Sequence, residues 1–139
     1  MYREINNSIY IYIMVKKIKK EYLPDKLTPS DKAKQKKSIL EGKDRPKVKF
    51  ESKRSSYVER FEKKYNFPIT NDNKISKEII SKTGIKQILS KGYGAYYSSG
   101  SRPNVSKFQW ARARLASVIL NGPARKVDSS IWLKYKIKK

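Results

Sequence analysis

The pattern of apolar and polar residues predicts two helices that face a core. A Ser-x-x-Glu capping box at residues 56–59 opens a run in which aromatic residues recur at every fourth position: Tyr57, Phe61 and Tyr65. A second box, Ser-x-x-Gln at residues 106–109, opens a helix over about residues 107–120 that Asn121, Gly122 and Pro123 close. Its buried stripe is expected to consist of Phe108, Ala111, Leu115, Val118 and Ile119.

Further helix signals lie before and between these two. Thr28-Pro29-Ser30-Asp31 is a helix start, with Thr as the N-cap and Pro in the first turn, and Gly42 is a natural stop. The residues between are mostly polar, so this helix is expected at a surface. Residues 76–92 predict two short helices, the first ended by Gly84 and the second by Gly92. We interpret them as a helical hairpin rather than a helix-turn-helix, because the second helix is too short for a reading head.

Two segments have the pattern of strands. Residues 9–15 are a continuous apolar run, and residues 131–137 alternate apolar with mostly basic side chains. Pairing of residues 8–15 with the C-terminal strand would give a small sheet. The sequence therefore predicts an α+β fold: a mainly helical small domain of three to four helices, a short N-/C-terminal β-pairing and an extended basic connector at 45–54.

The expected organisation has three parts. Residues 1–21 are an N-terminal strand and basic lead, 22–55 a basic helix with the extended connector, and 56–139 a compact helical domain with the C-terminal basic strand. The apolar run at 9–15 is too short to cross a membrane and lacks the features of a signal peptide.

Charge adds a partner class to this picture. The chain has 34 basic and 12 acidic residues among 139, a net charge of +22, which favours an anionic partner such as nucleic acid, an acidic protein surface or anionic lipid. Residues 91–139 carry eleven of the basic residues and one acid, Asp128. The absence of Cys and His excludes disulfides, Cys/His zinc sites and thiol or imidazole catalysis.

The stretch 91–104 combines three glycines, three tyrosines and an arginine, and we expect a loop that binds an anion or a partner. The expected anion- or partner-binding residues are Lys91, Arg102, Lys107, Arg112 and Arg114. The expected aromatic contacts are Tyr93, Tyr96, Tyr97 and Trp110. The structural alternative makes Gly92 a helix C-cap, the tyrosines and Trp110 core residues, and the arginines either paired or solvated.

Catalytic motifs are not found in this stretch. The glycine spacing matches neither a Walker A loop nor a dinucleotide fingerprint, and no facing carboxylates or acidic metal cluster stand out. No catalytic residue, metal, cofactor or small-molecule substrate is expected, and the protein is not expected to be an enzyme.

Several blocks together resemble a known family. They are Arg45-Pro-Lys-Val-Lys-Phe50, Gly92-x-Gly-Ala-Tyr-Tyr-Ser-Ser-Gly-Ser-Arg-Pro-Asn104 and Trp110-Ala-Arg-Ala-Arg-Leu-Ala-Ser117. They resemble a family of small basic proteins of large double-stranded DNA viruses of algae and protists, which has shorter relatives in phages. The resemblance covers about residues 22–128 and implies a viral setting without a mechanism.

Dispersed charge in a viral setting gives two functional hypotheses. The first is a virion structural protein, a minor capsid or internal cementing protein that binds acidic capsid proteins, the genome or an anionic inner membrane surface. The second is a nucleic-acid-binding protein that acts in packaging, repair or transcription. Either would place the protein in the virion, or in the host cytoplasm or nucleus during assembly.

Overall fold

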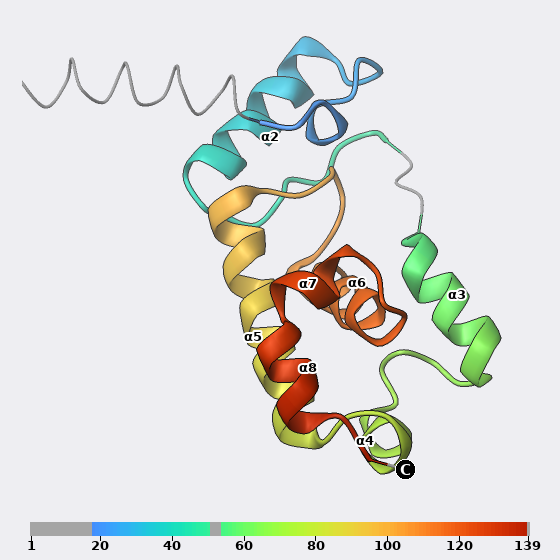
Figure 1. Ribbon diagram of the computed structural model, residues 1–139. Helices are drawn as coiled ribbons and strands as arrows, with labels where there is room; N and C mark the ends of the chain where they lie inside the picture. Colours follow the sequence, from blue (N-terminus) through green and yellow to red (C-terminus); the bar gives the residue numbers. More distant parts are fainter. Residues whose placement is uncertain (1–17, 51–53, 139) are drawn as a thin grey trace, which may run out of the picture. The chain divides into compact units, whose positions relative to one another are not determined.

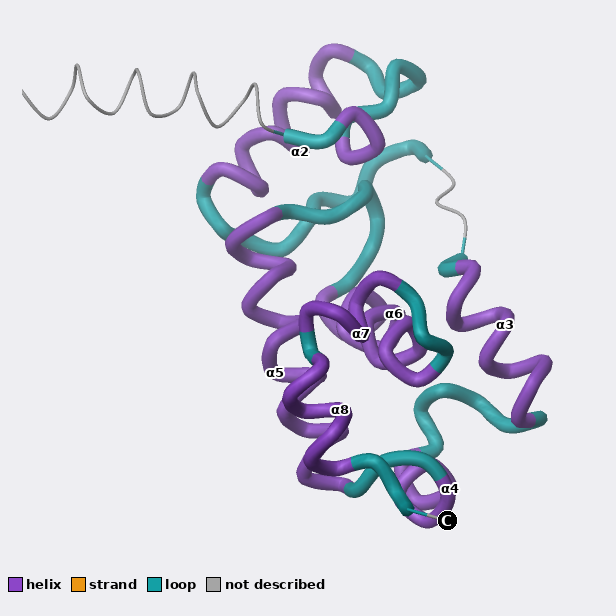
Figure 2. The backbone as a smooth tube through the Cα atoms, viewed as in Figure 1, coloured by secondary structure: helices purple, strands orange, loops and turns teal. Residues whose placement is uncertain are grey.

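The computed structural model describes residues 18–50 and 54–138, and these residues form helices joined by turns and irregular segments (Figure 1). The elements in chain order are η1 (Lys20–Tyr22), α2 (Pro29–Leu40), α3 (Ser56–Tyr65), α4 (Asp72–Glu78), α5 (Lys82–Ser99), α6 (Lys107–Ile119), α7 (Pro123–Val127) and α8 (Ser129–Tyr135). Figure 2 shows no strand among the described residues. Their one β-type pairing is an isolated antiparallel bridge between Ile80 and Lys136.

The expected α+β class is therefore wrong, and the described part of the chain is all-helical. The expected C-terminal strand is helix α8. Helical spacing places Ile131 and Tyr135 on one face, where Ile131 is buried and Tyr135 packs against the core, whereas Leu133 stays exposed. The order of apolar and basic side chains in this segment is compatible with a strand and with a helix. The helix is the form in which Ile131 and Tyr135 pack together against the core. Residues 8–15, the expected partner strand, lie outside the described residues.

Helix α5 departs most from the sequence-based expectation. Helix ends were expected at Gly84 and Gly92, followed by a glycine loop, but the break between helices lies at residues 79–81, and a single helix runs through Gly84 and Gly92. A side chain at Gly92 would place its Cβ 2.8 Å from the Cα of Ala111, and one at Gly84 would come within 2.6 Å of the Tyr135 Cβ. A glycine inside a helix costs about 1 kcal/mol relative to alanine. These two glycines allow close packing of neighbouring helices and do not end a helix.

The helix starts are closer to expectation. Thr28 caps α2 as predicted, and its hydroxyl accepts a hydrogen bond from the Asp31 N–H at 3.1 Å. Helix α3 begins one position earlier than expected, because Ser55 rather than Ser56 is its N-cap. Helix α6 has nearly the predicted bounds, and the chain leaves it through Asn121 at φ 59°.

The described residues divide into two compact units. Unit 1 comprises residues 18–50 and 95–106, and unit 2 comprises residues 54–94 and 107–138. Helix α5 contributes its first thirteen residues to unit 2 and its last five to unit 1. The segment 95–106 thus belongs to the same unit as α2.

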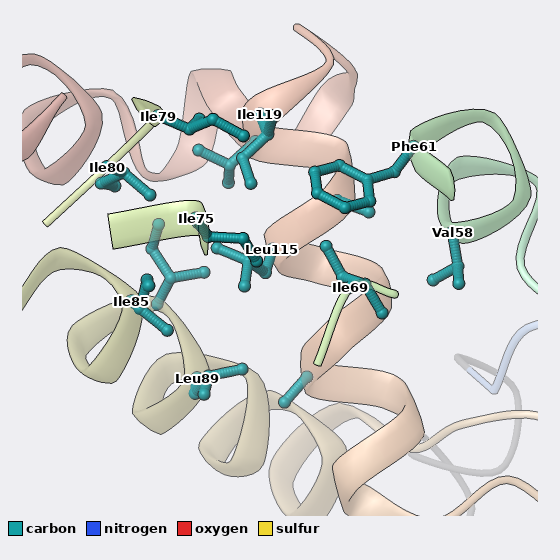
Figure 3. Close-up of a cluster of buried hydrophobic side chains, with 14 of the residues drawn as sticks. Val58, Phe61, Ile69, Ile75, Ile79, Ile80, Ile85, Leu89, Leu115 and Ile119 are labelled. Carbon is teal, nitrogen blue, oxygen red and sulfur yellow. The ribbon is translucent and has the colours of Figure 1, made fainter. Parts of the chain in front are cut away.

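Unit 2 contains the apolar core (Figure 3). Side chains from α3, α4, α5 and α6 converge there, among them Phe61, Ile75, Ile85 and Leu115, all at 0–1% exposure. The predicted stripe of α6 is confirmed for Ala111, Leu115, Val118 and Ile119. It is wrong for Phe108, which is 60% exposed.

Unit 1 is packed differently. Its buried apolar side chains are Tyr22, Leu27, Ile39, Tyr96 and Pro103. Its buried polar side chains are nearly as numerous: Gln35, Ser38, Arg45 and Ser101. Polar groups therefore make up a large part of what unit 1 buries.

Candidate functional site

The structure divides the expected site residues between the two units. Arg102, Tyr96 and Tyr97 belong to unit 1. Those in unit 2 are Lys91, Tyr93, Lys107, Trp110, Arg112 and Arg114. The expected glycine loop is helical as far as Ser99, so its amides are bonded within α5 over that length.

Arg112 on α6 is held by an acid of its own unit. Its Nη1 and Nη2 lie 2.5 and 3.3 Å from the two carboxylate oxygens of Asp72, and Nη1 also donates to the Ile69 carbonyl at 3.2 Å. The arginine side chain is 20% exposed. This guanidinium ties α6 to the start of α4 and is already paired.

Arg114 forms the most enclosed ion pair of unit 2. Its Nε and Nη2 donate to the two oxygens of Asp128 at 2.7 and 2.8 Å, and the Asp128 side chain is fully buried. This hydrogen bonding raises the pKa of Arg114, against the opposing effect of burial. The Lys91 ammonium lies 3.9 Å from the same carboxylate. The only acid of residues 91–139 is therefore occupied by two of the expected anion-binding residues.

Arg102 is the expected arginine that remains most accessible. Its Nη2 donates to Glu21 at 3.1 Å, and both side chains are about half exposed. An exposed pair of this kind contributes only about 0–1 kcal/mol. Arg102 can therefore exchange Glu21 for an external anion at little cost.

The tyrosines of unit 1 have structural contacts. The Tyr96 hydroxyl accepts a hydrogen bond from the Arg45 N–H at 2.8 Å and donates to the Val105 carbonyl at 3.1 Å, and its ring is buried. The Tyr97 hydroxyl donates to Asp44 at 2.8 Å. For Tyr96, the structure matches the core alternative of the sequence analysis.

Arg45, which was not among the expected site residues, is buried, with 8% exposure. Its guanidinium lies 4.7 Å from the Tyr96 ring centroid, and Nη2 donates to the carbonyls of Lys43 and Ser38 at 2.6 and 3.4 Å. Nε and Nη1 have no partner among the described residues, and burial lowers the pKa of this group. One signal was present: within residues 16–53, Arg45 is the only arginine beside thirteen lysines. Arginine is preferred over lysine where a cation is buried and stacks on an aromatic ring.

Lysines form most of the cationic surface. The described residues of unit 1 include twelve basic and five acidic side chains, and those of unit 2 include seventeen and five. Many lysines are exposed and have no ion pair among the described residues, including Lys34, Lys47 and Lys49 in unit 1 and Lys63, Lys77, Lys82, Lys86 and Lys126 in unit 2. These ammonium groups are the main charges available to an external partner.

Unit 2 also has an exposed aromatic group, which we name the Phe108 cluster: Tyr93, Lys107 and Phe108. The Tyr93 and Phe108 rings meet edge to face, with centroids 5.8 Å apart and planes at 81°. The Lys107 ammonium lies 5.2 Å from the Phe108 centroid and 6.0 Å from that of Tyr93. Tyr93 and Lys107 were expected site residues; Phe108 was missed because its helical position predicted burial.

The described residues hold neither a membrane-spanning helix nor a metal-ligand cluster. None of the helices there has the length and apolar character needed to span a membrane. No group of three or more acidic side chains gathers there as metal ligands.

Comparison with known proteins identifies a family. The chain matches no curated protein and no solved structure. A family match covers residues 2–131 and so includes residues 2–21, which lie before the viral resemblance begins. The chain belongs to DUF5824, a family of unknown function.

Proposed function

We propose that this protein is a non-enzymatic virion structural protein of a large DNA virus, a minor capsid or internal cementing protein. Its partners would be acidic capsid proteins, the genome or both. The viral setting rests on the resemblance of the 92–104 block and its neighbours. The observation that carries the binding role is that arginines pair inside the units while lysines remain exposed.

Internal pairing determines where the excess charge lies. Arg112 and Arg114 neutralise Asp72 and Asp128, and an ion pair joins Arg54 to Glu62. The positive excess is consequently carried by exposed lysines on both units. Such an excess repels itself, and an anionic partner relieves that repulsion.

The distribution of these lysines favours a cementing role over a single reading head. They lie on helices of both units, with Lys34 on α2, Lys63 on α3 and Lys86 on α5 as examples. A lysine is a flexible point charge that does not need a fixed geometry to contact an anion. Many such contacts together bind an acidic surface, whatever the sequence that forms it.

Quantitative proteomics of purified virus particles tests this proposal. We expect the protein at a stoichiometry comparable to that of minor capsid components. Carbodiimide cross-linking of intact particles, which activates carboxylates and joins them to amines as amides, should link exposed positions such as Lys34 and Lys49 to acidic segments of capsid proteins. Absence of the protein from purified particles would contradict a structural role.

The Phe108 cluster favours a second candidate, a nucleic-acid-binding protein that acts in packaging, repair or transcription. An exposed aromatic ring beside an ammonium group suits contact with a base and a phosphate. If lysines bind phosphates, affinity for DNA falls steeply with salt, with a log–log slope set by the number of phosphates neutralised. Binding that does not change with salt concentration would exclude this candidate.

A further inference from the structure

The packing of α5 against α6 positions an aromatic pair at the surface of unit 2. Gly92 packs on Ala111, with no room for a Cβ between them. Tyr93 follows this contact on α5, and Phe108 precedes it on α6 by three residues, one helical turn. The close contact therefore brings the two rings together, and Phe108 is left 60% exposed.

Tyr93 restricts the orientation of the exposed ring. The edge-to-face contact at 5.8 Å supports Phe108 on one side. Edge-to-face contact is one of the arrangements that two aromatic rings prefer. A supported ring loses little conformational freedom when a flat ligand stacks on it, so the cluster is partly preorganised.

Charge identifies the kind of flat ligand. The Lys107 ammonium lies beside both rings, and the described residues of unit 2 carry seventeen basic against five acidic side chains. A purely apolar partner would gain nothing from this ammonium. A nucleotide presents a flat base to the ring and a phosphate to the ammonium, and so matches both parts of the cluster.

We propose that the Phe108 cluster is a stacking platform for an unpaired nucleobase of single-stranded nucleic acid. Phe108 stacks on the base, Tyr93 supports the phenyl ring, and Lys107 binds an adjacent phosphate. In a duplex the base faces are covered by their neighbours, so the platform selects unpaired strands. This inference rests on the second candidate function, nucleic-acid binding, and it names the kind of strand that is bound.

The test compares three probes of equal length at one salt concentration by fluorescence anisotropy: oligothymidine, an oligomer of abasic sites and a duplex. The first two share a phosphate backbone and differ in their bases. We expect the full chain to bind oligothymidine roughly tenfold more tightly than the abasic oligomer, since stacking of one base contributes about 1–3 kcal/mol. Phe108→Ala should abolish this difference and leave affinity for the abasic oligomer unchanged.

Two variants serve as controls. Leu133→Ala removes an apolar side chain of similar exposure (61%) elsewhere in unit 2 and should not change the preference for bases. Phe108→Trp keeps an aromatic face and should retain that preference, which separates stacking from loss of folding. Lys107→Gln should weaken binding of both single-stranded probes.

Three results would overturn the inference: equal affinity of the unmodified protein for oligothymidine and the abasic oligomer, tighter binding of the duplex, or a preference for bases that survives Phe108→Ala. Particle proteomics tests the structural role separately. A protein that is absent from virions but prefers bases through Phe108 would disprove the structural role alone.

Discussion

The two units of this protein bury different chemistry. Unit 2 encloses a continuous apolar core, with sixteen buried apolar residues in one cluster. The described residues of unit 1 bury five apolar side chains and four polar ones, and one of the polar groups is the guanidinium of Arg45. Apolar burial is non-directional, whereas a buried polar group depends on its hydrogen-bond partners. The two units should therefore respond differently to substitutions.

The two units should also differ in their stability against local unfolding. Within residues 18–50 and 54–138, two buried donor atoms of Arg45 and one buried acceptor of Gln35 have no hydrogen-bond partner. Buried unpaired polar groups cost about 1–3 kcal/mol each. Unit 1 is therefore expected to open at a lower free energy than unit 2, which hydrogen exchange resolved by residue would measure.

The largest expected loss of stability comes from a substitution in the core of unit 2. Leu115→Ala should lower the free energy of unfolding by about 3–5 kcal/mol, because it leaves a cavity at a fully buried position. Leu133→Ala makes the same chemical change at an exposed site and should cost less than about 0.5 kcal/mol. Chemical denaturation followed by circular dichroism measures both. Similar losses in the two variants would mean that Leu115 does not lie in a close-packed core.

The buried ion pair of unit 2 should give the next largest effect. Asp128→Asn leaves the mostly buried Arg114 without its charge partner and should cost about 2–3 kcal/mol. Asp72→Asn removes the more exposed partner of Arg112 and should cost about 1 kcal/mol or less. If the two variants melt alike in thermal denaturation, the enclosure of Asp128 contributes little to stability.

Unit 1 should be sensitive to the loss of a single oxygen atom. Tyr96→Phe leaves the buried Arg45 N–H without its acceptor and should cost about 1–2 kcal/mol. Amide exchange should accelerate in residues 18–50 and 95–106 while the core of unit 2 stays protected. Tyr97→Phe removes a more exposed hydroxyl and should change exchange less. Equal acceleration in both units would contradict their separate packing.

The smallest expected effect is a gain in stability. Gly94 lies inside α5, and a Cβ added there would extend into open space. Gly94→Ala should therefore stabilise the protein by about 0.5–1 kcal/mol. Gly92→Ala, two residues earlier, places a methyl group against the backbone of Ala111 and should destabilise the protein instead. Thermal denaturation of the pair gives the sign of each change. A gain in both would show that α5 and α6 do not meet closely at Gly92.

Local signals in the sequence predicted part of the fold. The Thr28 cap, the bounds of α6 and four of its five stripe residues follow from rules that act within one or two helical turns. The continuity of α5 does not follow from such rules. Glycine is common just after helix ends, and only the close approach of Ala111 to Gly92 and of Tyr135 to Gly84, which the sequence does not show, explains glycine inside α5.

The candidate site was harder to predict for a similar reason. The acid that pairs with Arg112 lies forty residues away, and the one that pairs with Arg102 lies eighty-one away. Charge counting identified the basic side chains but not their internal partners. It therefore selected arginines that the fold had already paired, and it overlooked the exposed ring of Phe108.

The side chain of Asn104 holds the 48–50 segment in place. Its side-chain oxygen accepts from the Val48 N–H at 2.9 Å, and its amide nitrogen donates to the carbonyls of Val48 and Phe50 at 2.8 and 2.6 Å. The amide thus anchors the 48–50 segment through main-chain atoms alone. The exposed side chains at Lys47 and Lys49 are not needed for that anchor. These two positions are therefore suited to site-specific fluorophores or photo-cross-linkers, which would report on neighbouring molecules without disturbing the fold.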